Sequence, residues 1–251
     1  MRKKVLVLGS NFGGLTAALA VKHELHGDVD VQVISPSDRF VFNPSLIWLP
    51  FGKRSPKDIT FPVAPTFEKA GIDFVYAAVT DIDPEGKRVR TTDGTWTGFD
   101  YLVIATGYQN KMDVVPGLAE NAVTITTLKD AVRAGERWRE FLDDPGDVVI
   151  AAAQGAGCFG AAYEFLFNTS YRLRKAGLKK RVNLSYVSAE PFLGHFGIGG
   201  LPHGESLLGM FMKKENITAR LNAEMDHVAQ DAVVLSDGAE IPFKYAMIVP
   251  P

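Results

Sequence analysis

The chain has 251 residues, a formal net charge of −2, a hydrophobic fraction of 46% and a charged fraction of 22%. These values are ordinary for a soluble globular chain, and the length allows two domains. The near-neutral charge, with no basic stretch interleaved with aromatic residues, argues against a nucleic-acid partner. No apolar run approaches the roughly 18 residues of a membrane span. We therefore expect no transmembrane segment. We also expect no secretory signal, because the N-terminus runs directly into a strand.

The first half opens with a strand, a glycine-rich turn and a helix, at residues 5–8, 9–14 and 15–25. A second strand follows at 31–34 and ends in Ser35. Segments of alternating polarity then predict further strands, separated by a Pro-Glu-Gly turn and an Asp-Gly turn. A last apolar strand begins at Tyr101.

The second half repeats this order at an offset near 145 residues. Gly155 corresponds to Gly9, and Tyr245 corresponds to Tyr101. Between them, three further features recur in the same order. These are the second strand, an isoleucine (Ile72 and Ile217) and an Asp-Gly turn (93–94 and 237–238). Five matches at one offset indicate an internal duplication. We therefore expect an α/β fold with two Rossmann-like dinucleotide-binding domains.

The boundary between the halves is expected at residues 143–147. This stretch reads Asp-Asp-Pro-Gly-Asp, and its Pro and Gly interrupt the preceding helix. We expect a first domain at 1–144 and a second, NAD-like domain at 145–251.

The first glycine turn is where a dinucleotide is expected to bind. Gly9 allows the tight turn, and Gly14 lets the helix pack close to the strand. Asn11 stands where a second glycine would let the pyrophosphate approach, and Asn tolerates positive φ better than most residues. Ser35 replaces the acidic residue that commonly holds the ribose. A βαβ turn without a ligand is the alternative reading.

The second glycine turn carries the one cysteine of the chain. Cys158 lies in the run Gly155-Ala156-Gly157-Cys158-Phe159-Gly160, after an apolar strand at 148–153 and before a helix at 161–174. This is the context that a dinucleotide fingerprint requires. Free N–H groups and the helix dipole at a helix start favour a thiolate. The alternative is a small residue that merely begins the helix.

Apart from His195, the histidines of the chain lack the spacing of a metal site, and we expect no metal. His195 lies in a glycine-rich segment, where an imidazole is able to accept or supply a proton near neutral pH. A loop histidine without a role is the alternative. No role is assigned to the other four, which are His23, His26, His203 and His227.

The order of elements resembles the flavoproteins of the pyridine nucleotide-disulfide oxidoreductase superfamily. Within it, the chain most resembles the sulfide:quinone oxidoreductases and their flavocytochrome c relatives. Residues 101–107, ending in Ala-Thr-Gly, resemble the superfamily's second flavin-contact strand. The stretches that carry the closer resemblance are 40–45, 58–62, 155–164 and 188–200. The last two are the most specific, and the resemblance spans the whole chain.

This resemblance implies an FAD-dependent enzyme that oxidises sulfide to sulfur or polysulfide and passes two electrons to a quinone. It implies that the first domain binds FAD, that Cys158 is redox-active near the flavin, and that His195 lies near the sulfide-oxidising site. Sulfide and quinone are the expected partners, and a homo-oligomer is left open. The expected FAD contacts are Gly9, Asn11, Phe12, Gly13, Gly14, Ser35, Pro36, Asn43, Pro44, Val79, Ala105, Thr106 and Gly107.

The sequence departs from the family pattern at three points. Residues 125–128 read Ile-Thr-Thr-Leu where the family has a further cysteine, and Asp130 replaces a family histidine. The family's other redox cysteine lies beyond residue 251. By the repeat, Pro250-Pro251 align with Thr106-Gly107, so we expect a C-terminally truncated chain that does not turn over sulfide alone and exposes an apolar groove on its first domain. Membrane contact is expected only through segments outside this chain, with a location in the cytoplasm or at the inner-membrane surface.

Two alternatives stay open. In a nicotinamide-dependent flavin reductase, the second glycine turn would bind NAD(P)H. Cys158 opposes this reading because its side chain would intrude on the pyrophosphate, whereas Glu190 favours it because an acid near the end of the matching strand is able to hold a ribose. The other alternative is a non-catalytic flavin-binding fragment.

Overall fold

The computed structural model describes residues 2–25 and 28–251. The chain forms two compact units. The first contains Met1–Phe42 and Ile59–Gln109, and the second contains Asn43–Asp58 and Asn110–Pro251. No helix within the described ranges is long and apolar enough to cross a membrane. His26, to which no role was assigned, lies outside the described residues.

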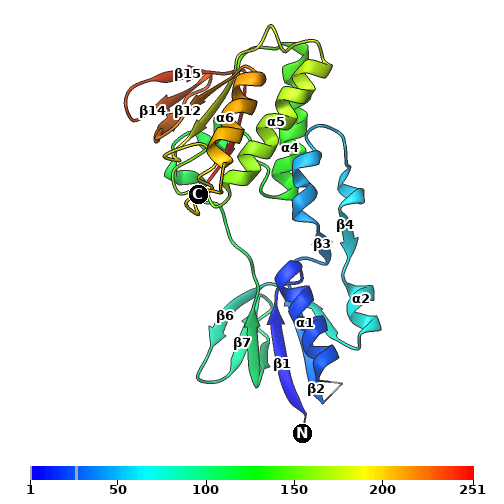
Figure 1. The fold of residues 1–251 in the computed structure, drawn as a ribbon. Helices are drawn as coiled ribbons and strands as arrows, with labels where there is room; N and C mark the ends of the chain where they lie inside the picture. Colours follow the sequence, from blue (N-terminus) through cyan, green and yellow to red (C-terminus); the bar gives the residue numbers. More distant parts are fainter. Residues whose placement is uncertain (1, 26–27) are drawn as a thin grey trace. The chain divides into compact units, whose positions relative to one another are not determined.

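A parallel sheet with the strand order β5-β2-β1-β9 forms the centre of the first unit (Figure 1). Its strands are β1 (Lys3–Leu8), β2 (Val29–Ser35), β5 (Asp73–Tyr76) and β9 (Tyr101–Ile104). The helices α1 (Phe12–Glu24) and α2 (Ala64–Lys69) pack on one face through a core that includes Val7, Ala18 and Phe67. Strand β9 lies at the sheet edge, where Tyr101 and Ile104 are exposed. The predicted groove on this unit stays a prediction.

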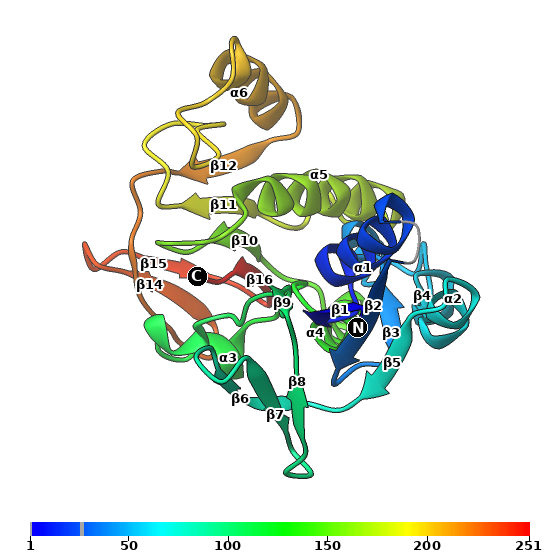
Figure 2. The ribbon, with the colours of Figure 1, turned by 90° about the horizontal axis from the view of Figure 1, so that it is seen from below.

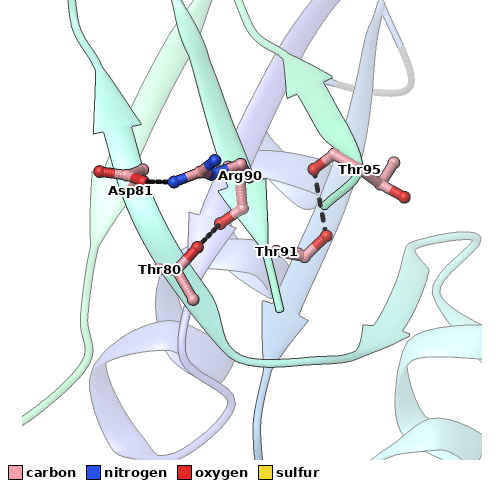
Figure 3. A network of polar contacts seen from close by, with 5 residues as sticks. All are labelled: Thr80, Asp81, Arg90, Thr91 and Thr95. Carbon is pink, nitrogen blue, oxygen red and sulfur yellow. Dashed lines mark hydrogen bonds and ion pairs between the residues drawn. The ribbon is translucent and has the colours of Figure 1, made fainter. Parts of the chain in front are cut away.

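The other face of this sheet is covered by an antiparallel sheet. It consists of β6 (Val79–Asp83), β7 (Arg88–Thr91) and β8 (Trp96–Gly98), and Val89 packs against Leu6 and Leu8. Figure 3 shows the polar contacts that join these strands. Asp81 pairs with Arg90, Thr80 Oγ1 donates to the Arg90 carbonyl at 3.3 Å, and Thr91 Oγ1 donates to the Thr95 carbonyl at 3.1 Å. A two-stranded antiparallel sheet, formed by β3 (Arg39–Val41) and β4 (Thr60–Pro62), completes the strands of this unit.

The second unit repeats this architecture, with a parallel sheet in the order β12-β11-β10-β16 (Figure 2). Its strands are β10 (Val148–Ala152), β11 (Leu184–Ser188), β12 (Ile217–Arg220) and β16 (Tyr245–Val249). Every residue of β10 is buried, which explains why the sequence reads as a continuous apolar run. Helix α6 (Gly204–Lys214), which the sequence analysis did not predict, packs beside β12.

Alternate residues of β10 face two different layers. Val148 and Ile150 contact the core beneath α4 (Leu128–Asp143) and α5 (Phe159–Lys175). Val149 and Ala151 face the other core, which a short helix and an antiparallel sheet of the second unit cover. These covering elements are α3 (Leu118–Asn121), β13 (Met225–Val228), β14 (Ala232–Leu235) and β15 (Glu240–Pro242), and η3 (Met112–Val114) precedes them.

The two sheets confirm the predicted duplication and fold class. Val5 pairs with Tyr101 in the first sheet, and Val148 pairs with Tyr245 in the second. The turn after the first strand begins with positive φ in both halves, at Gly9 (+102°) and Gly155 (+75°). The same strand order, register and turn conformation recur because the same sequence pattern recurs.

The compact units differ from the expected division at residue 144. Residues 110–144 and 43–58 belong to the second unit, including η1 (Asn43–Trp48) and η2 (Pro56–Asp58). The reason is burial of aromatic surface: the Phe51 ring lies 4.9 Å from Phe165 and 5.3 Å from Trp138, centroid to centroid. The assignment of whole functional domains stays a prediction.

Candidate active site

The first glycine turn is closely packed. A Cβ atom on Gly9 would lie 2.3 Å from the Ala105 carbonyl oxygen, and one on Gly14 would lie 1.9 Å from the Gly9 carbonyl oxygen. Neither position therefore accepts a side chain. The Gly9 N–H donates to Ile34 O and the Ala105 N–H donates to Leu8 O, both at 2.8 Å. The carboxyl ends of β1, β2 and β9 are thus held together, at the sheet edge where ligands of such folds bind.

Ser10 of this turn forms a buried pair with Ser35, the last residue of β2. Ser10 Oγ donates to Ser35 Oγ at 2.9 Å, and the Ser37 N–H donates to the same Ser35 oxygen at 3.2 Å. Ser35 is 3% exposed. Its hydroxyl therefore stabilises the turn by hydrogen bonds to Ser10 and Ser37. The ribose contact expected of Ser35 stays a prediction.

Asn11 precedes α1 and adopts φ −90°, so the expected tolerance of positive φ is not used. Its side-chain Oδ1 instead accepts the Val41 N–H at 3.3 Å. Phe12 follows, half-exposed, with its ring 4.8 Å from Phe40 and 5.7 Å from Phe42. The first N–H groups of a helix have no partner within it, so those at the start of α1 are available for an anion.

The structure brings most of the expected FAD contacts into the first unit, and two of them into the second. Asn43 and Pro44 begin η1, which packs in the second unit. Val79 packs beside Val89 in the small core under β6. The remaining contacts, at the glycine turn, after β2 and after β9, are Gly9, Asn11, Phe12, Gly13, Gly14, Ser35, Pro36, Ala105, Thr106 and Gly107.

The second glycine turn is open where the first is crowded. A Cβ on Gly157 would meet nothing within 4 Å among the described atoms, and one on Gly160 would meet only Cys158 Sγ, at 4.0 Å. The close contact between Gly14 and the backbone of Gly9 has no counterpart at Gly160. Cys158 precedes α5 directly, adopts extended backbone geometry (φ −152°, ψ 91°) and is exposed. Its thiol therefore lies accessible at the start of a helix of 17 residues.

His195 lies in a turn built around its own backbone and ring. Its carbonyl oxygen accepts the N–H groups of Ile198 and Gly200, at 3.0 and 2.9 Å. Its Nδ1 accepts the Gly197 N–H at 3.2 Å. A ring that accepts at Nδ1 carries its proton on Nε2 when neutral. A Cβ on Gly197 would lie 3.6 Å from the Phe159 ring, so this loop reaches the residue that follows Cys158.

Glu190 is buried and turned into the core of the second unit. It is 1% exposed. Its Oε2 accepts hydroxyl groups from Tyr186 at 2.8 Å, Ser188 at 2.9 Å and Tyr163 at 3.0 Å. Its Oε1 accepts the Phe196 N–H at 2.7 Å. Burial raises the pKa of both tyrosines, so their hydroxyl groups remain protonated donors.

The burial of Glu190 and its hydrogen bonds to the two tyrosines were not predicted from the sequence. Glu190 follows β11 at the position from which an acid commonly reaches a ribose, but its carboxyl group has no free oxygen facing solvent. The signal in the sequence was the pair Tyr163 and Tyr186, whose hydroxyl groups need acceptors when their rings are buried.

Residues 3–249 match the family described as pyridine nucleotide-disulphide oxidoreductase. The chain belongs to this family. FAD is the cofactor that this membership indicates, and the crowded glycines and free helix N–H groups of the first turn fit its pyrophosphate. The expected fold, family and cofactor are confirmed.

The chain is similar to sulfide-quinone reductase of Aquifex aeolicus, with 34% identity over 254 residues, which cover 100% of this chain and 59% of that protein. The crystal structure of the sulfide:quinone oxidoreductase of Aquifex aeolicus superposes with a TM-score of 0.94 over 99% of this chain and 58% of that chain. A type II NADH:quinone oxidoreductase of Staphylococcus epidermidis is also 34% identical, over 204 residues, which cover 76% of this chain and 50% of that protein. The chain therefore spans half to three fifths of the length of these relatives.

Proposed function

We propose that the natural protein is an FAD-dependent oxidoreductase that oxidises sulfide to sulfur or polysulfide and reduces a quinone. The observation that carries this proposal is the contrast at the second glycine turn. Cys158 is exposed at the start of α5, while Glu190 is buried and fully hydrogen-bonded. Such a site has an accessible thiol for sulfur chemistry, and it has no accessible carboxylate that could bind a ribose. The similarity to sulfide-quinone reductase over the whole chain supports the same conclusion.

FAD would bind with its pyrophosphate at the start of α1, against the backbone of Gly9 to Gly14. Ala105 and the two residues after it would complete the part of the site that the first unit supplies. The chemistry that FAD would supply when bound is the uptake of two electrons from a sulfur donor and their transfer to a quinone.

Cys158 would act as the sulfur that leaves when sulfide attacks. HS⁻ attacks the second sulfur of a bridge between Cys158 and that sulfur. A new S–S bond forms to the incoming sulfide, the bridge bond breaks, and its electron pair leaves on the Cys158 thiolate. The helix start favours this anion. Cys158 is the single cysteine among residues 1–251, so the second sulfur belongs to a group outside this sequence.

His195 would exchange the proton of sulfide. While the Gly197 N–H occupies Nδ1, the neutral ring carries its proton on Nε2 and would offer sulfide a hydrogen-bond donor there. A second proton site on the ring becomes available only when the Gly197 hydrogen bond breaks. The role rests on the position of the loop beside Phe159, directly after Cys158.

A nicotinamide-dependent flavin reductase is the second candidate. The 34% identity to a type II NADH:quinone oxidoreductase favours it. The burial of Glu190 opposes it, because binding a ribose through this residue would require breaking its hydrogen bonds to Tyr186, Ser188 and Tyr163. Membrane-surface attachment, an inner-membrane or cytoplasmic location and self-association stay predictions under both candidates.

Steady-state reduction of a water-soluble quinone analogue by the natural full-length protein tests the proposal. Sulfide and NADH are supplied as electron donors in parallel, at equal concentrations. We expect turnover with sulfide and none above background with NADH. Turnover with NADH alone would replace the proposal by the second candidate, and a bound flavin reduced by neither donor would support the non-catalytic alternative.

A further inference from the structure

Glu190 is connected to the backbone on both sides of His195. On one side, its Oε1 accepts the Phe196 N–H at 2.7 Å. On the other side, the Gly194 N–H donates to Tyr163 Oη at 2.9 Å, and that hydroxyl donates to Glu190 Oε2 at 3.0 Å. The residues immediately before and after His195 are therefore held by one buried carboxyl group.

The backbone of this loop does not hold its shape by local preference. Phe196 has φ +54°, a left-handed conformation that residues other than glycine rarely adopt. Its ring packs against Tyr163 with 5.2 Å between centroids, in an edge-to-face arrangement. Gly194 and Gly197, on either side, also have positive φ. A conformation of this kind persists when surrounding contacts fix it, and the contacts here lead to Glu190 and Tyr163.

The loop conformation in turn sets the state of the imidazole. The Gly197 N–H that donates to His195 Nδ1 belongs to the residue directly after Phe196. A shift of the Phe196 peptide would move this donor away from Nδ1. The proton would then no longer be confined to Nε2 in the neutral ring.

We propose that Glu190 is a positioning residue that fixes the orientation and tautomer of His195 through Phe196 and through Tyr163. The role of His195 in sulfide chemistry rests on the proposed function, whereas the positioning itself concerns only the second unit. An acid at the position of a ribose ligand thus serves a different purpose in this chain. It holds the loop that carries His195, the candidate residue for proton exchange with sulfide.

Three single variants separate positioning from general stability. Glu190→Gln keeps the size of the side chain but replaces one acceptor oxygen by an NH₂ donor. Tyr163→Phe removes the hydroxyl that connects Glu190 to Gly194. Tyr186→Phe is the matched control, because it removes a hydrogen bond to the same Oε2 from a tyrosine that contacts no loop amide through its hydroxyl.

The experiment uses isotope-labelled protein in solution without sulfide or quinone. Amide hydrogen exchange of Gly194 and Phe196 reports the loop, exchange of the β10 amides reports the fold, and the imidazole ¹⁵N shifts report the tautomer of His195. In Tyr163→Phe and Glu190→Gln we expect exchange of the loop amides to rise about tenfold relative to β10, and the ring to populate both tautomers. In Tyr186→Phe we expect both readouts to match the parent protein.

Unchanged loop exchange and an unchanged His195 tautomer in folded Tyr163→Phe would overturn the proposal, even if Glu190→Gln does not fold. Equal effects in Tyr186→Phe would also overturn it, because loss of any hydrogen bond to Glu190 would then suffice. These readouts require no electron donor, so a failure of sulfide oxidation in the parent protein would contradict the proposed function alone.

Discussion

Tyr163 Oη and Glu190 Oε2 lie 3.0 Å apart, although the residues are separated by 27 positions in the sequence. This hydrogen bond connects α5, which begins directly after Cys158, to the loop after β11, which carries His195. The two candidate catalytic residues of the second unit therefore lie on elements that one buried polar cluster joins. The same cluster occupies the carboxyl group that a ribose would need.

Replacing Glu190 with alanine should destabilise the second unit strongly. Two tyrosyl hydroxyl groups, one serine hydroxyl and one amide would lose their acceptor in a buried site. We expect the free energy of unfolding to fall by on the order of 3 kcal/mol or more, measured by urea denaturation. Glu224→Ala is the control, because Glu224 is exposed, and should change stability by less than about 0.5 kcal/mol. Equal stability of the two variants would refute the buried role of Glu190.

Replacing Gly9 with valine should abolish flavin retention. The new Cβ would lie 2.3 Å from the Ala105 carbonyl oxygen, at a residue with φ +102°. The turn would have to open, and the backbone that receives the pyrophosphate would move. The measurement is flavin content per protein after gel filtration.

A control for Gly9→Val separates the clash from backbone strain. Gly94 also has positive φ (+85°), but a Cβ there would meet nothing within 4 Å among the described atoms. Gly94→Ala should cost about 1 kcal/mol of stability and leave flavin content unchanged. Normal flavin content in Gly9→Val would rule out the placement of FAD at this turn.

Replacing Cys158 with serine in the full-length protein should remove sulfide-dependent quinone reduction. The residue is exposed and precedes α5, so the fold and the flavin content should not change. Cys158→Ala should likewise alter the free energy of unfolding by less than about 1 kcal/mol. Turnover near that of the parent protein would exclude Cys158 as the reacting sulfur.

The buried tyrosines predict how stability depends on alkaline pH. Burial raises the pKa of Tyr163, Tyr186 and Tyr245 above the ordinary value of 10. Above about pH 10 these groups ionise in the unfolded chain but not in the folded one, so the unfolded state binds fewer protons. Stability contributed by the three residues is therefore complete below pH 10 and is lost as pH rises above it.

Absorbance of tyrosinate near 295 nm, measured together with circular dichroism, tests this behaviour. The chain has seven tyrosines, and we expect the three buried ones to ionise only with unfolding. Tyr245→Phe should move the alkaline transition to higher pH, because it removes one of these groups. Ionisation of all seven tyrosines before any loss of secondary structure would contradict the prediction.

Much of the fold could be predicted because its signals are local. The turn at Gly9, the helix after it and the repeat of both around Gly155 follow from glycine positions and apolar strands. The place of residues 43–58 could not be predicted in this way. It depends on Phe51 reaching Trp138 and Phe165, which are distant in sequence.

The candidate site was predictable in position but not in the direction of its side chains. Ser35 ends β2 and Glu190 follows β11, the equivalent strand, and each lies where a ribose ligand was expected. The structure turns both inward, Ser35 towards Ser10 and Glu190 towards Tyr163 and Tyr186. Ser10 is 25 positions from Ser35, and Tyr163 is 27 positions from Glu190, so no local pattern contains these partners.

In the proposed function, sulfide and not a nicotinamide delivers electrons to the flavin of the natural protein. The most direct measurement is the flavin absorbance near 450 nm in the oxygen-free, FAD-loaded full-length protein, before and after one equivalent of donor. We predict that sulfide bleaches the band in the parent protein but not in Cys158→Ser, and that NADH leaves the band unchanged in both. Bleaching by NADH with no response to sulfide would contradict the proposed function.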